Sequence, residues 1–380
     1  MKNFLPKQYK KDNSLKINHN YLQPQYKPIK NKILKKIDNL FKNVDFTLGK
    51  EVDIFENKFS RKINAKYAIG VGSGTDALFL SLKALGIKEG DEVITTAYTF
   101  YATVGAIATS GAKPVFVDIK EDYNIDEDKI EKSITKKTKA IVPVHWTGRP
   151  CNMDKIMHLA NKHNIHVIED ACHAYLAKFK NKYCGNFGTF GCFSFHPLKN
   201  LNVGGDGGMI VTNSKKFATK IKLLRNHGLI NRDKCKVYAY NSRLDSIQAI
   251  IGNEMIKNIN FITKKRISNS HYLDLKLNGI KEISFPKRNK KYLEVFHLYI
   301  IKVGQRSKLQ KYLISNGIDA KVHYKIPMHL QPASNYLNYK KGDFPLSEKI
   351  CKNILSLPVH EYILKKDLDK MVKLIKKFYS

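Results

Sequence analysis

The 380-residue sequence lacks any apolar run that approaches the roughly 20 residues needed to span a bilayer. Its first residues, MKNFLPKQYKKDNSLK, are polar and rich in lysine, so they also lack the apolar stretch of a secretory signal. From these two absences we expect a cytoplasmic protein that does not insert into a membrane.

Cysteine is scarce and irregularly placed, with no CxxC pair. The six cysteines are Cys151, Cys172, Cys184, Cys192, Cys235 and Cys351. A chain of this length does not depend on a disulfide framework, so we expect reduced thiols that are mostly buried. Four histidines fall between residues 158 and 173, but HExxH and closed Cys/His patterns are absent. We therefore predict no metal site, and the absence of GxSxG argues against an acyl-transfer hydrolase.

Acidic residues are few: 33 Asp and Glu stand against 67 Lys and Arg, which gives a formal net charge of +34. Such a charge can indicate nucleic-acid binding. Here the basic residues are spread along the whole chain and form no basic arm interleaved with aromatic residues. We therefore expect no nucleic-acid partner, and we expect the basic surface to attract a substrate that carries phosphate groups.

Apolar segments are present in an alternating order. Runs typical of buried strands occupy residues 68–73, 91–96, 114–119, 140–145 and 166–171. Helical patterns occupy residues 21–43, 52–63, 75–85, 101–111 and 153–164. This repeated strand–helix unit predicts an α/β fold, with a mostly parallel sheet covered by helices on both faces.

The pattern changes after about Lys264, where a strand at 295–303 and a helix at 306–317 precede two further helices. We interpret this part as a smaller α+β unit. The predicted organisation is a polar arm over residues 1–20, a large α/β domain over 21–264 and a small domain over 265–380.

A lysine occupies a conspicuous position in FSFHPLKNLNVGGDGGMIVTN (193–213). Lys199 lies between an aromatic strand and a loop with four glycines, which let the backbone approach a ligand closely. A lysine in such a loop can form a Schiff base with an aldehyde cofactor once its amine has lost a proton. Taken alone, the position of Lys199 favours the plainer interpretation, one surface lysine among many.

An acidic pair, Glu169 and Asp170, ends the apolar strand in HVIEDACHA (166–174). Ligands of parallel α/β sheets bind outside the carboxyl ends of the strands. A carboxylate there can pair with the protonated pyridine nitrogen of pyridoxal phosphate, which keeps that ring an electron acceptor. Aspartate is also a favoured helix N-cap, so both interpretations remain open.

Glycine and hydroxyl residues precede a helix in VGSGTDALFLSL (71–82), which predicts a phosphate site at the helix N-terminus. Gly72, Gly74 and Ala77 also fit a loose dinucleotide fingerprint, so a nicotinamide cofactor is a competing interpretation. Tyr98 and Phe100 follow a predicted strand, and either ring could stack on a flat cofactor or fill the core.

Taken together and in this order, these motifs resemble the pyridoxal-phosphate-dependent nucleotide-sugar aminotransferases of the DegT/DnrJ group, which have fold type I. The resemblance runs from about Tyr21 to the C-terminal helices. Its most specific pieces are SGTDAL (73–78), EDACHA (169–174), SFHPLKNLNVGGDGG (194–208), NSRLDSIQA (241–249) and VHYKIPMH (322–329). The sequence departs from the group in carrying GDGG (205–208) where GEGG is common.

The resemblance implies a role for each matching residue. Lys199 would carry the cofactor as a Schiff base and shuttle protons, and Asp170 would pair with the pyridinium nitrogen. Phe100 would stack on the ring, and His173 would lie near the ring hydroxyl. The implied ligands of the phosphate are Gly74, Thr75, Asp76 and Ser194.

The resemblance also implies a homodimer with shared active sites, because Asn241 and Arg243 match residues that reach the phosphate of the neighbouring subunit's cofactor. The implied lining of the sugar pocket is His323, Tyr324 and His329.

The function that follows is transfer of an amino group from an amino acid, glutamate, to a keto-sugar linked to a nucleoside diphosphate. RLDSIQA (243–249) looks more like relatives that aminate carbon 3 than like those with a different residue after the Arg-Leu pair, so we favour a 3-keto over a 4-keto sugar. Three alternatives remain. A nicotinamide dehydrogenase would leave Lys199 and Asp170 without roles. A dehydratase or another sugar-modifying enzyme could use the same Schiff base. A non-enzymatic regulatory or nucleic-acid-binding protein would hold no chromophore.

Overall fold

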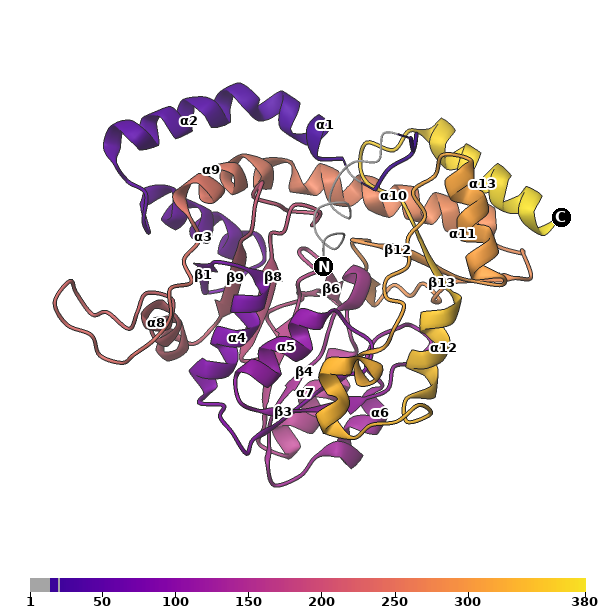
Figure 1. Ribbon diagram of the computed structural model, residues 1–380. Coiled ribbons are helices and arrows are strands. Elements are labelled where there is room, and N and C mark those ends of the chain that lie inside the picture. The colour runs from indigo at the N-terminus through magenta and orange to yellow at the C-terminus, as the bar shows by residue number, and fades with distance from the viewer. Residues whose placement is uncertain (1–13, 20) are drawn as a thin grey trace.

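The computed structural model describes residues 14–19 and 21–380, and a seven-stranded sheet lies at its centre (Figure 1). The strands lie across this sheet in the order β1 (Tyr67–Val71), β9 (Gly208–Thr212), β8 (Phe190–Ser194), β5 (His166–Asp170), β4 (Thr138–Val142), β2 (Glu92–Thr96) and β3 (Lys113–Val117). All pairings from β8 to β3 are parallel, and β9 is antiparallel to both of its neighbours. The predicted mostly parallel sheet is thus confirmed.

The strands are buried along nearly their whole length because helices cover both faces of the sheet. One face carries α2 (Lys30–Asn43), α3 (Lys50–Lys62), α9 (Ser246–Met255), α6 (Glu127–Ile130) and α7 (Met153–Lys162). The other face carries α4 (Gly74–Leu85), α5 (Tyr101–Thr109) and α8 (Lys215–Leu224). Side chains alternate between these faces: Phe193 packs with the first group, and Cys192 packs with the second.

The C-terminal part builds a second core. Its antiparallel sheet contains β10 (Ile283–Ser284), β12 (Tyr299–Val303) and β13 (Ile354–Leu357). Its helices are α11 (Arg306–Ser315), α12 (Pro345–Asn353) and α13 (Lys365–Tyr379). A third small sheet of β6 (Lys178–Phe179), β7 (Lys182–Tyr183) and β11 (Tyr292–Leu293) joins segments from both halves of the chain.

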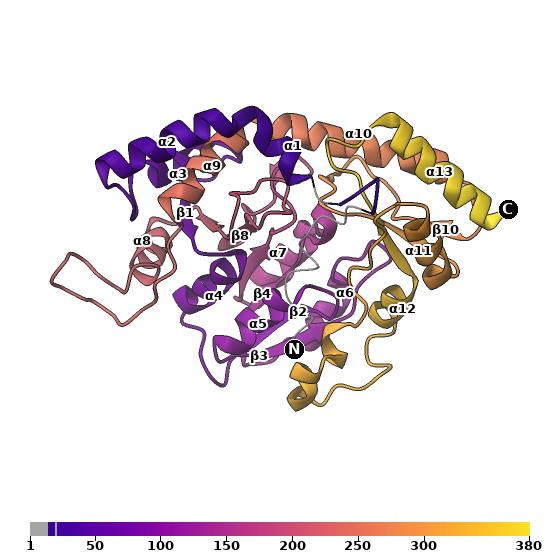
Figure 2. The same ribbon diagram turned by 45° about the horizontal axis from the view of Figure 1, so that its top comes forward.

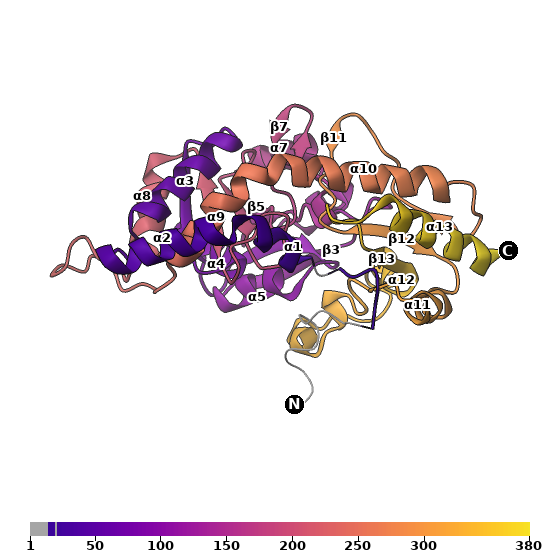
Figure 3. The same ribbon diagram turned by 90° about the horizontal axis from the view of Figure 1, so that it is seen from above.

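The long helix α10 (Ile259–Leu277) connects the two parts, as Figures 2 and 3 show. Ile259 packs in the core of the large sheet, whereas Leu273 and Leu277 pack in the C-terminal core. The predicted boundary after residue 264 lies within this helix, and the division into two domains stays a prediction.

One strand is shorter than the sequence indicates. The apolar run 295–303 was expected to be a strand, but β12 begins only at Tyr299. Phe296 has a positive φ of 46°, and the guanidinium of Arg266 donates to the carbonyls of Phe296 and His297 at 3.2 and 3.3 Å. These bonds hold the residues just before Tyr299 away from the sheet of β10, β12 and β13.

Within residues 14–19 and 21–380, no helix combines the length and apolar character that crossing a bilayer requires. The same residues contain no group of three or more His, Cys, Asp or Glu placed to hold a metal ion. The six cysteines are free, and four of them are buried.

Candidate active site

The predicted site residues come from loops that meet at one edge of the large sheet. Strands β1, β2, β5 and β8 run in the same direction, so their carboxyl ends share this edge. Gly74 follows β1, Phe100 follows β2, Asp170 ends β5, and Lys199 follows β8. This is the edge at which α/β sheets bind ligands.

Lys199 is half-buried in the loop after β8, and its backbone N–H donates to the carbonyl of His196 at 2.8 Å. A small pocket opens beside it and is lined in addition by Cys172, Ser194 and His297. Burial lowers the pKa of the Lys199 amine, and nearby Cys172 and Asp170 only partly offset this effect. A larger fraction of the amine is therefore neutral and nucleophilic than in water.

Asp170 is 5% exposed and points toward α5. Its Oδ2 accepts a hydrogen bond of 2.8 Å from the hydroxyl of Thr103, which in turn lies 2.8 Å from the hydroxyl of Thr99. Its Oδ1 accepts from the backbone N–H of Cys172 at 3.1 Å. These donors hold the carboxylate in place.

Glu169, the other member of the acidic pair, points to the opposite face because side chains alternate along a strand. It is fully buried and accepts hydrogen bonds of 2.6 to 2.8 Å from the backbone N–H groups of Gly185, Phe187 and Gly188. Its Oε2 also lies 2.9 Å from Nε2 of His145. Glu169 therefore holds a loop, and Asp170 is the carboxylate that faces the site.

The N-terminus of α4 forms the predicted phosphate site. The Ser73 hydroxyl caps the helix by accepting from the N–H of Asp76 at 3.0 Å, while the first N–H groups of a helix have no partner within it. A Cβ at Gly74 would lie 2.6 Å from Cβ of Ser194, too close for two carbons, so glycine lets the start of α4 pack directly against the end of β8. Thr75 is exposed and Asp76 is half-buried. The residues present thus fit the phosphate group of pyridoxal phosphate.

His173 and His297 form a ring pair beside Lys199, with centroids 4.3 Å apart. Burial, with a further contribution from Lys199, holds the pKa of His173 well below its ordinary value. Its Nδ1 accepts from the N–H of Thr147 at 3.3 Å, so the neutral ring carries its proton on Nε2. In this tautomer Nε2–H is a donor, and it could donate to an acceptor such as the oxygen of the cofactor's ring hydroxyl. His297 was not predicted, because it lies in a run that resembles a plain strand.

The two candidate stacking rings, those of Tyr98 and Phe100, have different environments. Tyr98 is fully buried against Trp146, with ring centroids 4.7 Å apart. Phe100 is 45% exposed at the start of α5, and its ring lies 5.7 Å from that of Tyr324. Phe100 is therefore the ring available to a flat cofactor, and Tyr98 belongs to the core.

Two of the three residues predicted for the sugar pocket, His323 and Tyr324, lie near the two aromatic rings. The N–H of Tyr324 donates to the hydroxyl of Tyr98 at 3.0 Å. Burial lowers the pKa of His323 to about 4, with contributions from Lys321 and Lys199. His329 has the contacts of a core residue: it is 2% exposed, packs on Phe344 and lies 3.1 Å from Glu348. A direct role of His329 toward a sugar stays a prediction.

Asn241 and Arg243 lie beside the loop that precedes α4. The hydroxyl of Ser242, between them, accepts from the N–H of Gly72 at 3.1 Å. The guanidinium of Arg243 donates to Oδ1 of Asn226 at 3.0 Å and is half-buried, while Asn241 is exposed. Within one chain, both side chains have the position of surface residues near the phosphate site.

The loose dinucleotide fingerprint does not lie in a dinucleotide-binding unit. Such a fingerprint belongs to a strand with parallel neighbours. Here β1 is an edge strand that pairs only with the antiparallel β9 in the described sheet. Gly208, at the start of β9, allows this pairing because a Cβ there would lie 2.2 Å from the carbonyl oxygen of Ser73.

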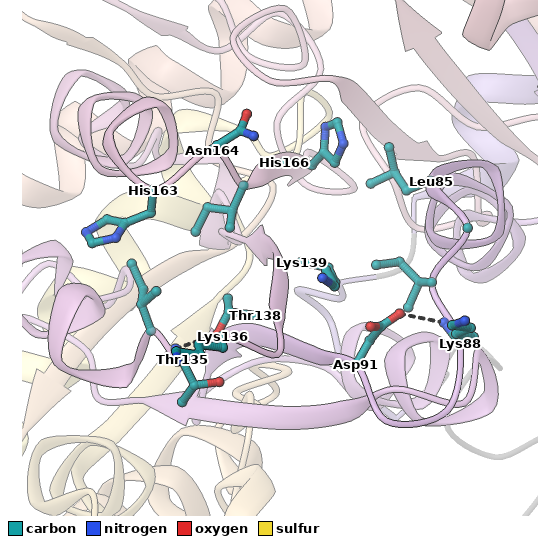
Figure 4. Close-up of a pocket in the computed structure, with 14 residues that line it drawn as sticks. Leu85, Lys88, Asp91, Thr135, Lys136, Thr138, Lys139, His163, Asn164 and His166 are labelled. Atoms are coloured by element: carbon teal, nitrogen blue, oxygen red, sulfur yellow. Dashed lines mark hydrogen bonds between the residues drawn. The ribbon is translucent and has the colours of Figure 1, made fainter.

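A larger hollow of about 800 Å³ lies at the opposite edge of the sheet, by the amino ends of β2, β4 and β5. Figure 4 shows Lys88, Lys136, Lys139, His163 and His166 around it. Because the predicted site residues gather at the carboxyl ends of the strands, this hollow is separate from the candidate active site.

Comparison with known proteins agrees with this geometry. A model of the DegT/DnrJ/EryC1/StrS aminotransferase family matches residues 27–376. A pleiotropic regulatory protein of Geobacillus stearothermophilus is 40% identical over 94% of this chain and 97% of its own length. UDP-N-acetyl-3-dehydro-alpha-D-glucosamine 3-aminotransferase of Acidithiobacillus ferrooxidans is 35% identical over 94% of this chain and 96% of its own.

Solved structures match as well. S. venezuelae DesV, in complex with a ketimine intermediate, superposes with a TM-score of 0.93 at 31% identity, covering 96% of this chain and 98% of that one. NtdA of Bacillus subtilis, with bound pyridoxamine phosphate, gives a TM-score of 0.86 at 31% identity, covering 91% and 81%. The chain belongs to the DegT/DnrJ/EryC1/StrS aminotransferase family and is a sugar aminotransferase that uses pyridoxal phosphate.

Proposed function

We propose that the chain transfers the amino group of glutamate to carbon 3 of a keto-sugar linked to a nucleoside diphosphate. The observation that carries this proposal is the placement of Lys199, with its lowered pKa, at the same sheet edge as the buried Asp170 and the N-terminus of α4. The preference for carbon 3 is supported by the 3-aminotransferase among the relatives and by the segment RLDSIQA (243–249).

The residues of this chain have distinct tasks in that reaction. When bound, pyridoxal phosphate supplies a ring that accepts electrons from the reacting carbon. Lys199 holds the cofactor and moves protons at that carbon as general base and acid. Asp170 keeps the ring nitrogen protonated, the amides of Gly74 and Thr75 bind the phosphate, and Phe100 covers the ring face.

The proposed sugar side of the pocket is the segment around His323 and Tyr324. A nucleoside diphosphate carries negative charge, and the formal net charge of +34 favours its approach. A cytoplasmic location and the two sugar-facing roles stay predictions.

The proposal includes a homodimer with shared sites. The loop between Asn226 and Asn241 projects from the molecule beyond α8 (Figure 1). It exposes large apolar side chains that a partner subunit would cover: Ile230 is 61% exposed, Val237 45% and Tyr238 fully exposed at 101%. Asn241 and Arg243, at the end of this loop, would then reach the partner's phosphate site, where the arginine fork can bind two phosphate oxygens.

Subunit mixing tests the shared site. Lys199→Ala and Arg243→Ala proteins, each inactive, are mixed and allowed to exchange subunits. If sites are shared, each mixed dimer has one site with both defects and one intact site, so roughly half of native activity returns per mixed dimer. Absence of recovery after proven exchange, or a fully active monomer, would contradict the proposal.

A further experiment distinguishes the proposed function from two alternatives, a dehydratase and a regulatory protein. The purified protein is incubated with glutamate labelled with heavy nitrogen and with a panel of UDP- and dTDP-linked 3-keto and 4-keto sugars, and products are identified by mass spectrometry. Transfer of label to a 3-keto sugar supports the proposal, and loss of water without label indicates a dehydratase. A protein that binds no pyridoxal phosphate would favour the regulatory role that the Geobacillus relative's name describes.

A further inference from the structure

The segment before α2 is built into the junction between the two parts of the molecule. Within it, Ile17 is 3% exposed and forms a parallel bridge with Ile318, and the N–H of His19 donates to Asp319 at 3.0 Å. These residues precede position 27, where the match to the family model begins. The segment therefore packs on the C-terminal part before the chain enters α1 (Leu22–Tyr26).

Tyr21 connects this segment to the cofactor lysine. It is 4% exposed, and its hydroxyl donates to the carbonyl of Leu198 at 3.0 Å, with the carbonyl of Lys199 as a second acceptor at 3.3 Å. Burial raises the pKa of Tyr21 above its ordinary value, so the hydroxyl keeps its proton and remains a donor. The contact spans 178 positions of sequence and reaches the backbone of the catalytic residue itself.

The ring of Tyr21 is fixed between two groups of the C-terminal half. It stacks on His360 with centroids 4.7 Å apart and an angle of 26°, and the guanidinium of Arg266 lies 4.9 Å from its centroid. Arg266 belongs to α10, the helix that joins the two parts. The ring is therefore held even without its hydroxyl.

A second set of hydrogen bonds, through Gln25, also connects the loop that carries Lys199 to the C-terminal part. Gln25 donates to Glu361 at 2.5 Å and accepts from the side chain of Asn202 at 2.9 Å. Glu361 in turn lies 3.7 Å from Arg266. The loop that carries Lys199 is thus tied at two points, through Tyr21 and Gln25, to the C-terminal part.

We propose that Tyr21 is a positioning residue for Lys199. Its hydroxyl fixes the carbonyls of Leu198 and Lys199, which flank the Cα of Lys199, so that the amine keeps its place near Asp170 while the C-terminal part stays docked. This inference rests on the proposed role of Lys199 as the residue that holds the cofactor.

The test compares Tyr21→Phe with the matched control Tyr26→Phe. Tyr26 is the last residue of the short helix α1, whose N-cap is Tyr21, and it is 43% exposed. Phenylalanine at position 21 keeps the ring stack and removes only the donor. In the apoprotein we expect amide hydrogen exchange of peptides covering residues 196–203 to become about ten-fold faster in Tyr21→Phe, since a lost buried hydrogen bond shifts a local opening equilibrium by about that factor.

In the protein loaded with pyridoxal phosphate, the visible band of the cofactor should titrate at a shifted pH in Tyr21→Phe. The kcat should fall about ten-fold, while KM for the sugar stays near its native value, because the change displaces Lys199 and leaves the sugar contacts in place. Tyr26→Phe should match the native protein in every measurement.

The outcomes are decisive in each direction. Native-like exchange and an unshifted band in Tyr21→Phe would overturn the proposal, and so would faster exchange in every peptide, which indicates general loss of stability. If the native protein takes up no pyridoxal phosphate, the proposed function fails, and the exchange measured on the apoprotein still decides whether Tyr21 holds the loop.

Discussion

The hydroxyl of Thr103 on α5 donates a hydrogen bond of 2.8 Å to Oδ2 of Asp170 at the end of β5. Thr103 is 1% exposed, so water cannot replace this donor in the structure. The carboxylate that faces the candidate active site is therefore positioned by a helix on the same face of the sheet.

We expect Thr103→Val to lower kcat about ten-fold and the free energy of unfolding by about 1–3 kcal/mol, because it removes one hydrogen bond to a buried carboxylate while it keeps the side-chain shape. Thr103→Ser keeps the hydroxyl and should restore most of the rate. Thr109→Val, at an exposed position on the same helix, is the control. An unchanged kcat in Thr103→Val would show that Asp170 is held well enough by the N–H of Cys172.

The two neighbouring carboxylates should respond oppositely to amide substitution. Asp170→Asn should keep the fold and lose most of the rate, because the cofactor's ring nitrogen loses its charged partner. Glu169→Gln should lower the free energy of unfolding by about 2–3 kcal/mol, because the amide group would face backbone donors that Glu169 now accepts.

Denaturant unfolding and turnover, measured on both variants, check this contrast. If Glu169→Gln loses activity without losing stability, Glu169 acts in the reaction and the assignment of the two residues is wrong.

Gly74→Ala should weaken cofactor binding. The added Cβ would lie 2.6 Å from Cβ of Ser194 and 3.1 Å from Sγ of Cys172, so the N-terminus of α4 would have to shift, and its backbone N–H groups with it. We expect the Kd for pyridoxal phosphate to rise at least about ten-fold, as measured by titration of the apoprotein.

Gly105→Ala is the matched control, since a Cβ at Gly105 meets nothing within 4 Å. That change lies within α5 and should stabilise the fold by about 0.5–1 kcal/mol without changing the Kd. Equal affinity in Gly74→Ala and native protein would exclude a phosphate at this helix end.

The sequence was sufficient to predict elements whose signal is local. Continuous apolar runs place the buried parallel strands within a few residues of their observed bounds, and the order of motifs points to Lys199 and Asp170. The antiparallel direction of β9 depends instead on its pairing with β1, whose residues lie about 140 positions earlier. No local pattern contains that information.

The same limit applies to the site. Thr103 looks like one hydroxyl in an apolar helix, and Tyr21 like the first residue of a helix, because their partners lie 67 and 178 positions away. Without the resemblance to the family, which selects Asp170, the residues alone did not separate Glu169 from Asp170, and the structure shows that the two point to opposite faces of the sheet. His329 illustrates the converse: a motif position predicted a pocket residue, and the structure gives it a core environment.

The buried histidines predict a loss of stability in mild acid. His360 is 8% exposed; its Nε2 donates to the carbonyl of Asn18 at 3.0 Å and its Nδ1 accepts from the N–H of Tyr362 at 3.2 Å. The bond that Nδ1 accepts requires the neutral ring, whereas Nε2 can donate in either protonation state. Burial, with Arg266 nearby, lowers the pKa of His360 to about 3, and burial lowers that of His323 to about 4.

Because these pKa values lie below the ordinary value of 6.5, the unfolded chain binds protons that the folded chain does not as the pH falls. The stabilisation is therefore complete above about pH 6.5 and is lost progressively toward about pH 4, by about 2–3 kcal/mol for each such histidine. Urea unfolding of the apoprotein at a series of pH values measures this slope. His360→Gln should make the slope shallower, whereas His158→Gln, at an exposed position on α7, should leave it unchanged. If His360→Gln keeps the native slope over this range, His360 is not one of the groups that resist protonation in the folded protein.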